Sequence, residues 1–156
     1  MDSSKGRQGL HSFRSVLYGV QNCMAICVVR LGTPRSPDEG LRLGTVRRPP
    51  RGVRKQDWGQ RDYFDVWVPE LAPSEDLRAW ALSEPLTPRR WESYKRRYLA
   101  QMRRPQSQRL ISLLAMLSLQ TNFAVGCYCE DESHCHRSLL RILLANQGAL
   151  ITEAGG

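Results

Sequence analysis

"TNFAVGCYCEDESHCHRSLLRILLANQ", residues 121–147, joins a strand pattern directly to a helix pattern. Residues 121–129 are mostly apolar and end with Cys127 and Cys129, a pattern that is typical of a buried strand. Residues 136–147 predict a short apolar helix that ends near Gly148. A strand that leads straight into a helix indicates an α/β fold.

The residues before this unit predict further strands and helices. Residues 25–31, 41–46 and 62–68 have strand patterns, with loops rich in glycine, proline or arginine between them. Ser74 and Thr87 are predicted N-caps of two helices, and Pro88 suits a first helical position. Residues 107–120 are apolar nearly all round and predict a well-buried helix, and residues 149–152 predict a last edge strand. The expected fold class is α/β, a single compact domain whose small, partly parallel sheet is flanked by helices.

The length of 156 residues suits one domain. Residues 1–23 are rich in serine, glycine and glutamine and are predicted to be an irregular extension. The domain is expected over residues 24–153, with residues 154–156 as a tail. No apolar run has the length of a membrane span, and no apolar segment follows the basic residues of the N-terminus. Five cysteines, three of them crowded together, favour reduced thiols and a cytoplasmic location.

The net charge of +8 and the isoelectric point near 9.7 permit attraction to a polyanion. Within residues 86–102 a 3.6-residue period places aromatic residues on one helix face and arginines on the other. The aromatic face is expected to pack on the core. The arginine face is expected in water or, in the alternative, against nucleic acid. It comprises Arg89, Arg90, Arg96 and Arg97, and continues into Arg103 and Arg104 directly after this range.

The chemistry that we expect lies between the strand at 121–129 and the helix at 136–147. Ligands of open α/β sheets gather at the carboxyl ends of strands, and a helix N-terminus favours negative charge. That field favours a thiolate at Cys135, while His136 and Arg137 add donors for an anion. Cys135 and Cys127 are therefore the candidate catalytic thiols. The expected order of alkylation is Cys135, then Cys129, then Cys127.

A zinc site is the first alternative for this cluster. Cys127, Cys129, Cys135 and either His134 or His136 could supply four ligands, and we prefer His136. The spacing of the first pair is C-x-C, whereas structural zinc sites usually have C-x₂₋₄-C. Residues 127 and 129 of a strand still point to the same face, so both could reach one ion. The leading interpretation has no cofactor, and zinc is the alternative.

Other thiol chemistries fit the same residues less well. Cys135 and Arg141 match a cysteine-phosphatase Cys-x₅-Arg pattern, but the residues between them are predicted to be helical and include no glycine. A redox pair of Cys135 with Cys127 or Cys129 remains an alternative, as does a cluster of packed, unreactive thiols. Cys23, Cys27 and His11 support no site.

From about Met24 to Ile151 the chain resembles the domain of unknown function family 488, also called the YeaO-like family. The resemblance rests on four segments of this sequence. They are "VRRPPRG" (46–52), "DVWVPELAPSEDLRAW" (65–80), "RWESYKRRYLAQM" (90–102) and "GCYCEDESHCHRSLL" (126–140). It implies a compact cytosolic α/β domain over residues 24–153 and no established activity.

The chain departs from the pattern of that family at four positions. Val46 stands where an aspartate is common, and Pro49 where a tryptophan is common. Gln101 replaces an acid, and Cys129 replaces a glutamate. The loss of these acids argues against a metal held through carboxylates. Arg47 and Arg51 still match.

We therefore expect an anion-binding, thiol-containing cleft, and one interpretation is an enzyme that acts on a small phosphorylated or carboxylated substrate. Arg47 and Arg51 follow one strand and Cys135 follows another, so parallel neighbouring strands would place them on one sheet edge. Arg137, His136, Arg47 and Arg51 are the candidate anion-binding residues. A nucleic-acid-binding module and a structural zinc protein are the alternatives. The sequence decides neither the oligomeric state nor whether the protein is an enzyme, and it favours no membrane partner.

Overall fold

The computed structural model of the chain describes residues 25–152. The extension predicted over residues 1–23 and the tail predicted over residues 154–156 lie outside the described residues. The described part comprises four strands, four α-helices and two 3₁₀ helices. In chain order they are β1 (Ile26–Arg30), β2 (Leu41–Gly44), η1 (Lys55–Asp57), β3 (Val66–Trp67), η2 (Pro69–Leu71), α1 (Glu75–Leu82), α2 (Pro88–Met102), α3 (Pro105–Leu117), β4 (Phe123–Cys127) and α4 (His136–Asn146).

The sheet has the strand order β1-β4-β2-β3. Every pairing between these strands is parallel, so the partly parallel sheet that was predicted is parallel throughout the described residues. β4 lies between β1 and β2, with Val125 opposite Val28 on one side and Leu43 on the other. The expected α/β fold is confirmed, and the carboxyl ends of β2 and β4 lie side by side.

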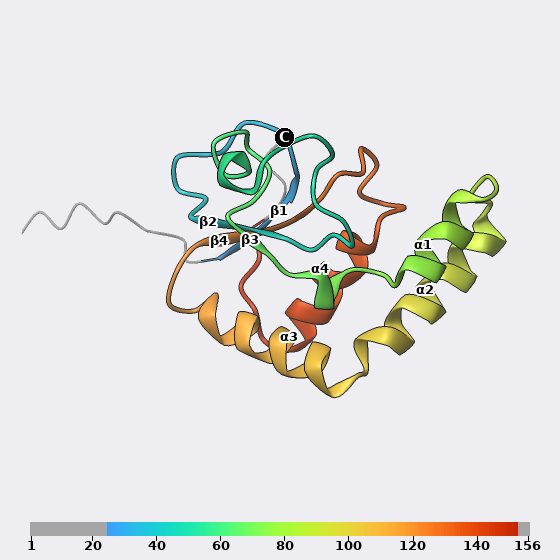
Figure 1. Cartoon of the computed structure of the whole chain (residues 1–156). Coiled ribbons are helices and arrows are strands. Elements are labelled where there is room, and N and C mark those ends of the chain that lie inside the picture. The colour runs from blue at the N-terminus through green and yellow to red at the C-terminus, as the bar shows by residue number, and fades with distance from the viewer. Residues whose placement is uncertain (1–24, 153–156) are drawn as a thin grey trace, which may run out of the picture.

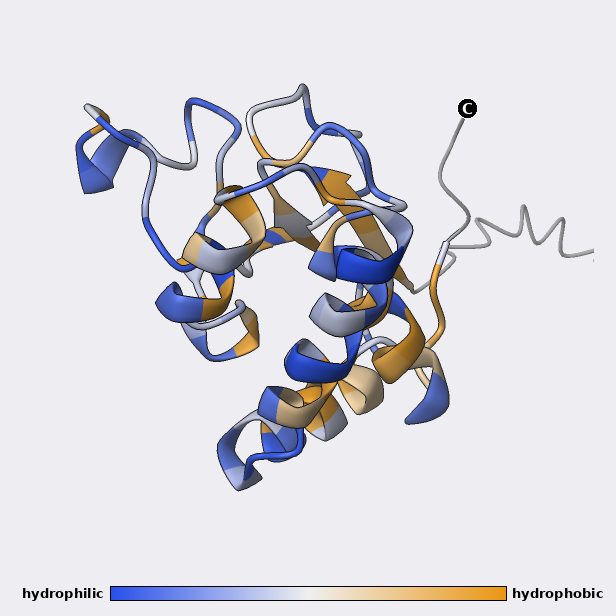
Figure 2. Cartoon of the chain, turned by 90° about the vertical axis from the view of Figure 1, so that its right-hand side faces the viewer, coloured by the Kyte–Doolittle hydropathy of each residue, from blue (hydrophilic) through white to orange (hydrophobic). Residues whose placement is uncertain are grey.

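The helices lie on one side of the sheet, and the long connections that contain η1 lie on the other (Figure 1). On the helix side, Ile26, Phe123 and Val125 of the sheet belong to one apolar cluster with Tyr98 of α2 and Leu140 of α4. We call this cluster the helix-side core. In Figure 2 the helices carry both hydrophobic and hydrophilic residues, as expected for helices with one face in water.

A smaller apolar cluster, the loop-side core, covers the other side of the sheet. Its buried members are Leu31, Val46, Phe64, Cys127 and Cys135. Two of the five are cysteines, so the thiols predicted to be reactive also belong to a packed cluster. The side chains of Cys127 and Cys135 thus combine a candidate reactive role with a packing role.

The N-caps of α1 and α2 are the residues that were predicted from the sequence. The Ser74 side chain accepts a hydrogen bond from the amide of Leu77, and that of Thr87 accepts one from the amide of Arg90. Gln101 of α2 also holds Ser74, since its side-chain amide donates to Ser74 Oγ at 2.7 Å and accepts from Ser74 N at 2.9 Å. The glutamine that departs from the family pattern therefore joins the start of α1 to α2.

Two predicted strands are much shorter than expected. Of residues 62–68, only Val66 and Trp67 pair with β2. Asp62 has a positive φ of 59°, which interrupts an extended chain before Phe64 turns into the loop-side core. The edge strand predicted at residues 149–152 is a single parallel bridge between Ile26 and Ile151.

The helix predicted to be well buried over residues 107–120 corresponds to α3, and that burial prediction is wrong for its outer side. Ile111 and Leu114 pack in the helix-side core. Leu113 and Met116, however, are 55% and 61% exposed. α3 packs through one face only, so an all-round apolar pattern does not imply all-round burial.

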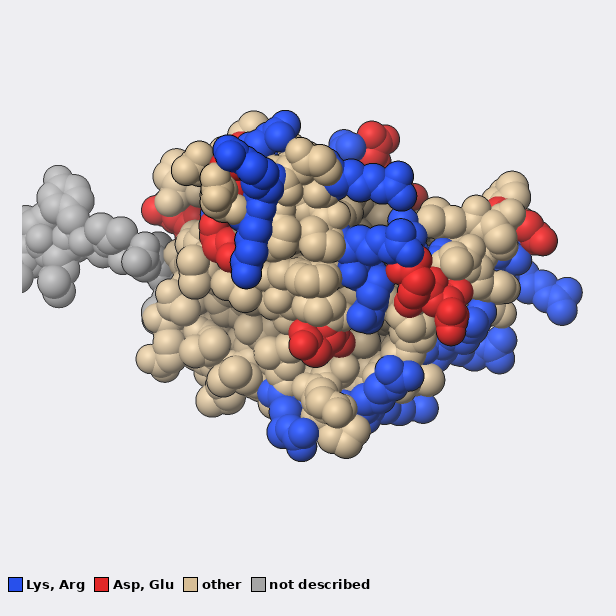
Figure 3. Space-filling model, viewed as in Figure 1, with Lys and Arg blue, Asp and Glu red and all other residues tan. Residues whose placement is uncertain are grey.

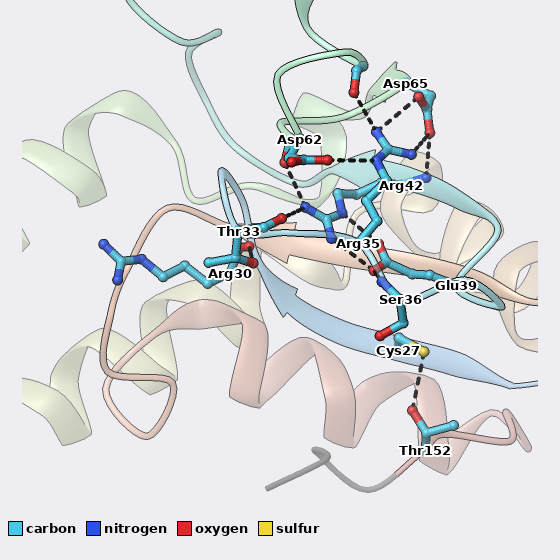
Figure 4. Close-up of polar contacts among 11 residues, drawn as sticks. Cys27, Arg30, Thr33, Arg35, Ser36, Glu39, Arg42, Asp62, Asp65 and Thr152 are labelled. Carbon is cyan, nitrogen blue, oxygen red and sulfur yellow. Dashed lines mark hydrogen bonds and ion pairs between the residues drawn. The ribbon is translucent and has the colours of Figure 1, made fainter.

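A buried ion pair fixes β2 to the loop before it. Arg42 is fully buried, and its guanidinium contacts the carboxylate of Glu39, with 2.8 Å between Nη2 and Oε2. Asp65 accepts the backbone amide of Arg42 at 2.8 Å and forms an ion pair with Arg35 at 2.7 Å (Figure 4). Asp62 lies in the same network, with its Oδ1 3.6 Å from Nε of Arg35. Charged side chains thus hold together segments that are 20 to 30 residues apart in the sequence.

Candidate functional site

A cleft of about 920 Å³ opens where β2 and β4 end and α4 begins. Residues that follow β2 form one part of its lining, and residues that follow β4 form another, as expected for the carboxyl edge of a parallel sheet. The lining also includes residues of α1, of the α1–α2 connection and of α2. The cleft is large enough for a small molecule.

Four arginines line the cleft, and we call them the arginine rim: Arg47, Arg48, Arg51 and Arg78. Arg47 donates to the carbonyl oxygens of Ala72 and Pro73, which fixes its loop against the start of α1. Arg48 and Arg78 both contact Glu75. Basic side chains gather on the face that Figure 3 shows, beside a group of acidic ones.

At the other side of the cleft, the sulfur atoms of Cys127, Cys129 and Cys135 all lie within 4.8 Å of one another. We call these three residues the cysteine cluster. Cys127 ends β4, Cys129 follows it by two residues, and Cys135 is the N-cap residue of α4. The Sγ atoms of Cys127 and Cys129 are 3.6 Å apart, in line with the prediction that both point to one face. Three free thiols close together can bind a metal ion, which fits the zinc alternative better than the expectation of no cofactor.

The three thiols differ in exposure and in acidity. Hydrogen bonds from Cys127 and Cys135, helped by the charge of Arg137, hold the pKa of Cys129 well below its usual value of 9.0. Cys127 keeps its proton, because donation to Cys129 raises its pKa to about 11. Donation to the other two sulfurs, together with burial, likewise raises the pKa of Cys135. Cys129 is also the exposed member, so the structure favours a thiolate there and not at Cys135.

His136 is the first residue of α4, and its ring is buried beside the cysteine cluster. Its Nε2 lies 2.6 Å from the carbonyl oxygen of Thr45, and its Nδ1 lies 3.7 Å from Sγ of Cys135. Burial lowers the pKa of His136 to about 4, so the ring is neutral near pH 7. Because a carbonyl only accepts, Nε2 carries the proton and Nδ1 presents its lone pair.

Arg137 is buried and is not part of the cleft lining. One of its guanidinium nitrogens, Nη2, donates to the carbonyl oxygen of Glu130, and Nε has no hydrogen-bond partner within the described part of the chain. Its charge acts on Cys129, whose pKa it lowers. Arg137 is thus placed to balance negative charge on the cysteine cluster.

The structure brings together most of the predicted site residues. Arg47, Arg51, Cys127, Cys135 and His136 line one cleft. The other zinc candidate, His134, lines the cleft too, but its Nδ1 lies 2.6 Å from the carboxylate of Asp131.

Tyr94 of α2 belongs to the aromatic face that was expected to pack on the core, and it does pack in the helix-side core, but it also lines the cleft. Burial raises the pKa of its phenol, and the three cysteines add to that shift, so the hydroxyl stays protonated beside the cluster. Tyr94 and Tyr98 are four residues apart and lie on one helix face. This spacing is the same for a residue that packs in a core and for one that lines a cleft. No local sequence signal separates the two.

The arginine face predicted on α2 is only partly solvated. Arg90 and Arg97 stack on the ring of Trp80 in α1, at 4.2 and 4.7 Å from its centre. These two arginines therefore join α1 to α2.

The segment that matches the Cys-x₅-Arg pattern is the start of a helix and not an anion-binding loop. Residues 136–146 form α4, and Arg141 pairs with Glu132.

A family model described as the active DUF488-N3 subclade matches residues 26–148. No curated protein and no solved structure matches the chain. The matched range includes every strand and helix of the described structure, and with them the arginine rim, the cysteine cluster and His136. The chain therefore belongs to the DUF488 family, which is the family also called YeaO-like.

Proposed function

We propose that the protein binds a small anionic molecule in the cleft. The observation that carries the proposal is the charge of the lining, which includes four arginines and one acidic residue, Glu84. Arg48 and Arg78 share Glu75, so Arg47 and Arg51 carry the charge that no carboxylate in the described residues offsets. Glu84 contacts Arg90, which lies outside the lining. A concave surface with such an excess of guanidinium groups favours phosphate or carboxylate groups, which arginine can hold with two hydrogen bonds.

The rest of the lining suggests the other part of the ligand. It is largely apolar or aromatic, with Tyr63, Tyr94, Tyr128, Pro49 and Pro50 among its residues. Such surfaces bind the flat or apolar body of a small molecule, while a few polar groups fix its orientation. The ligand that fits best therefore has an anionic group for the arginine rim and an apolar body that reaches toward the cysteine cluster.

Catalysis by Cys135 and Cys127 stays a prediction. Both side chains are buried, so a molecule in the cleft would meet the thiol of Cys129 first. This accessibility supports Cys129 as a third candidate for thiol chemistry. Binding of an anion does not depend on which sulfur reacts.

Arg51 offers the sharpest test of anion binding. It lines the cleft, is exposed, and forms no ion pair within the described residues. Arg51→Gln should weaken binding of inorganic phosphate, pyrophosphate or a small aromatic carboxylate by about tenfold, which corresponds to one charge-assisted contact. Arg89→Gln is the matched control, since Arg89 is exposed on α2 outside the cleft.

Isothermal titration calorimetry and melting temperature, both at fixed ionic strength, would measure the effect, because sodium chloride alone also screens surface charges. Equal loss of affinity in both variants would mean that the anions bind the surface at large. Absence of binding of every probe up to millimolar concentrations would refute the proposed function.

A further inference from the structure

We infer that Cys127, Cys129, Cys135 and Nδ1 of His136 form a tetrahedral site for Zn²⁺. This inference concerns the cysteine cluster and does not depend on binding of an anion by the arginine rim. It adds a fourth ligand to the three sulfurs. It also assigns two supporting residues, Thr45 and Arg137.

The sulfur positions suit a single ion of this size. With zinc–sulfur bonds of about 2.3 Å and tetrahedral angles, two sulfur ligands lie about 3.8 Å apart. Cys127 and Cys129 are 3.6 Å apart, and all three sulfurs lie within 4.8 Å of one another. The Cys127–Cys129 pair needs a shift of about 0.2 Å, and the approach of Cys135 a shift of at most about 1 Å, to complete the sulfur part of the site.

His136 is the candidate fourth ligand by its distance to one sulfur. The group of ligand atoms within 4.8 Å of one another contains the three sulfurs but no nitrogen of His136, so the ring has to move toward the cluster when an ion binds. A tetrahedral site places a nitrogen and a sulfur ligand about 3.6 Å apart, and Nδ1 of His136 is 3.7 Å from Sγ of Cys135. Metal-binding histidines almost always donate their other ring N–H to an oxygen of the protein. Here Nε2 of His136 donates to the carbonyl of Thr45 at 2.6 Å. His134 lacks this arrangement, because its Nδ1 contacts Asp131.

Secondary structure positions three of the four ligands, whereas Cys129 lies in the connection between β4 and α4. Cys127 ends the central strand β4, and Cys135 and His136 begin α4. Thr45 is itself fixed to β4, because its amide and its hydroxyl both donate to the carbonyl of Gly126, at 3.0 and 2.9 Å. Most of the backbone around the proposed ion is therefore fixed before the ion binds, which lowers the cost of ordering the ligands.

The charge balance also fits. Zn²⁺ with three thiolates and a neutral imidazole has a net charge of −1. Arg137 is 3% exposed and has no carboxylate within ion-pair distance among residues 25–152. It directly follows His136 at the start of α4, and its Nη2 donates to the carbonyl oxygen of Glu130, the residue next to Cys129. A buried arginine needs a negative partner, and the zinc–thiolate centre would supply one unit of negative charge.

The full chain, treated with a chelator under reducing conditions and then titrated with Co²⁺, gives a direct test. Tetrahedral Co²⁺ with thiolate ligands has strong visible d–d bands and a near-ultraviolet sulfur-to-metal band. We expect both bands to saturate at one ion per chain and to disappear on addition of Zn²⁺. Absence of these bands in the wild-type protein, or binding without them, would overturn the inference.

Variants then identify the ligands. Cys129→Ser should weaken metal binding by more than about 100-fold, since even the hydrogen-bond partner of a ligand is worth about 10- to 100-fold. Cys129 is exposed, so this variant should fold, which circular dichroism would verify. His136→Gln should weaken binding and reduce the d–d intensity. The controls are Cys27→Ser, in β1 and outside the cluster, and His134→Ala, and both should bind like the wild type.

Two results would contradict the ligand assignment. One is wild-type affinity in both Cys129→Ser and His136→Gln. The other is iodoacetamide labelling of Cys129 at the same rate with and without Zn²⁺. Anion binding is measured separately on the metal-free protein, so failure of the metal site and failure of the proposed function give different results.

Discussion

Thr45 decides which nitrogen of His136 faces the cysteine cluster. Its carbonyl accepts the proton of Nε2, and the two residues are 91 positions apart in the sequence. The sequence therefore predicted His136 as a site residue but not the direction of its lone pair. The same limit applies to Cys129, because a position two residues beyond a strand does not reveal whether the side chain is buried or exposed.

The order of alkylation follows from the exposure of the three thiols. In chelator-treated protein we expect iodoacetamide to label Cys129 first, and Cys127 and Cys135 much more slowly, because the last two are buried. This order differs from the one expected from the sequence, in which Cys135 came first. Timed labelling with peptide mass spectrometry would measure it.

The partly exposed Cys27 in β1 provides an internal reference for that labelling, and denatured protein should label at every cysteine alike. Faster labelling of Cys135 than of Cys129 in the folded protein would contradict the packing described above. It would restore the order expected from the sequence.

At the scale of elements, local signals were sufficient where a short segment determines its own structure. Ser74 and Thr87 cap their helices as predicted, because an N-cap depends on residues within one turn. Elements that depend on distant partners were predicted less well. β3 is short because Phe64 packs into the loop-side core, and Arg90 leaves the solvated face of α2 because Trp80 lies beside it.

The buried ion pair before β2 should be sensitive to loss of one partner. Arg42→Ala leaves the Glu39 carboxylate buried without its partner and should lower the free energy of unfolding by about 3–5 kcal/mol. Denaturant unfolding monitored by circular dichroism would measure this change. The double variant Arg42→Met with Glu39→Leu should recover much of the loss, because it removes both charges.

Arg30→Ala is the matched control for this pair. It removes an exposed ion pair with Glu130 and should change the free energy of unfolding by less than about 1 kcal/mol. If Arg42→Ala were as mild as this control, the Arg42–Glu39 contact would not contribute as its burial implies.

Asp65 should make the unfolding free energy of the protein depend on pH in the acidic range. Partial burial raises its pKa, but hydrogen bonds from Arg35 and from the amide of Arg42 outweigh that effect, so the folded pKa is below the usual 3.8. The resulting stabilisation is complete above pH 3.8 and is lost as the pH falls through the lower folded pKa.

Asp65→Asn should therefore destabilise the protein near pH 7 and flatten the fall in its unfolding free energy in acid. Denaturant titrations from neutral pH down past 3.8 would test this, with the exposed Asp38→Asn as control. Parallel pH profiles for the wild type and Asp65→Asn would contradict the role given to Asp65.

For the molecule as a whole, composition and pattern predicted the α/β fold and the edge of the sheet at which the cleft lies. They did not predict how apolar surface is distributed, since α3 exposes Leu113 and Met116. The described part of the chain has no helix long and apolar enough to cross a membrane. Burial of a helix depends on which neighbours cover it, and that information is spread over the whole chain.

Nucleic-acid binding would need one continuous basic strip over the loop after β2 and the arginine face of α2. Arg48 pairs with Glu75 and Arg54 with Asp57, so acidic side chains interrupt that strip. We expect no shift of duplex or single-stranded DNA or RNA at tens of micromolar protein in low salt. A salt-dependent shift would instead support a polyanion surface, because each phosphate contact releases counterions.

The position of β4 between β1 and β2 has a consequence for biosynthesis. β1 and β2 leave the ribosome early, yet β1 and the edge of β2 that faces away from β3 have no partner strand until residues 123–127 have been made. Contacts so distant in sequence slow folding, and until then the nascent chain exposes two apolar strand edges that other chains can capture. The cleft and its thiols are consequently among the last parts of the domain to assemble. A chain stopped before β4 would be a substrate for chaperones and proteases.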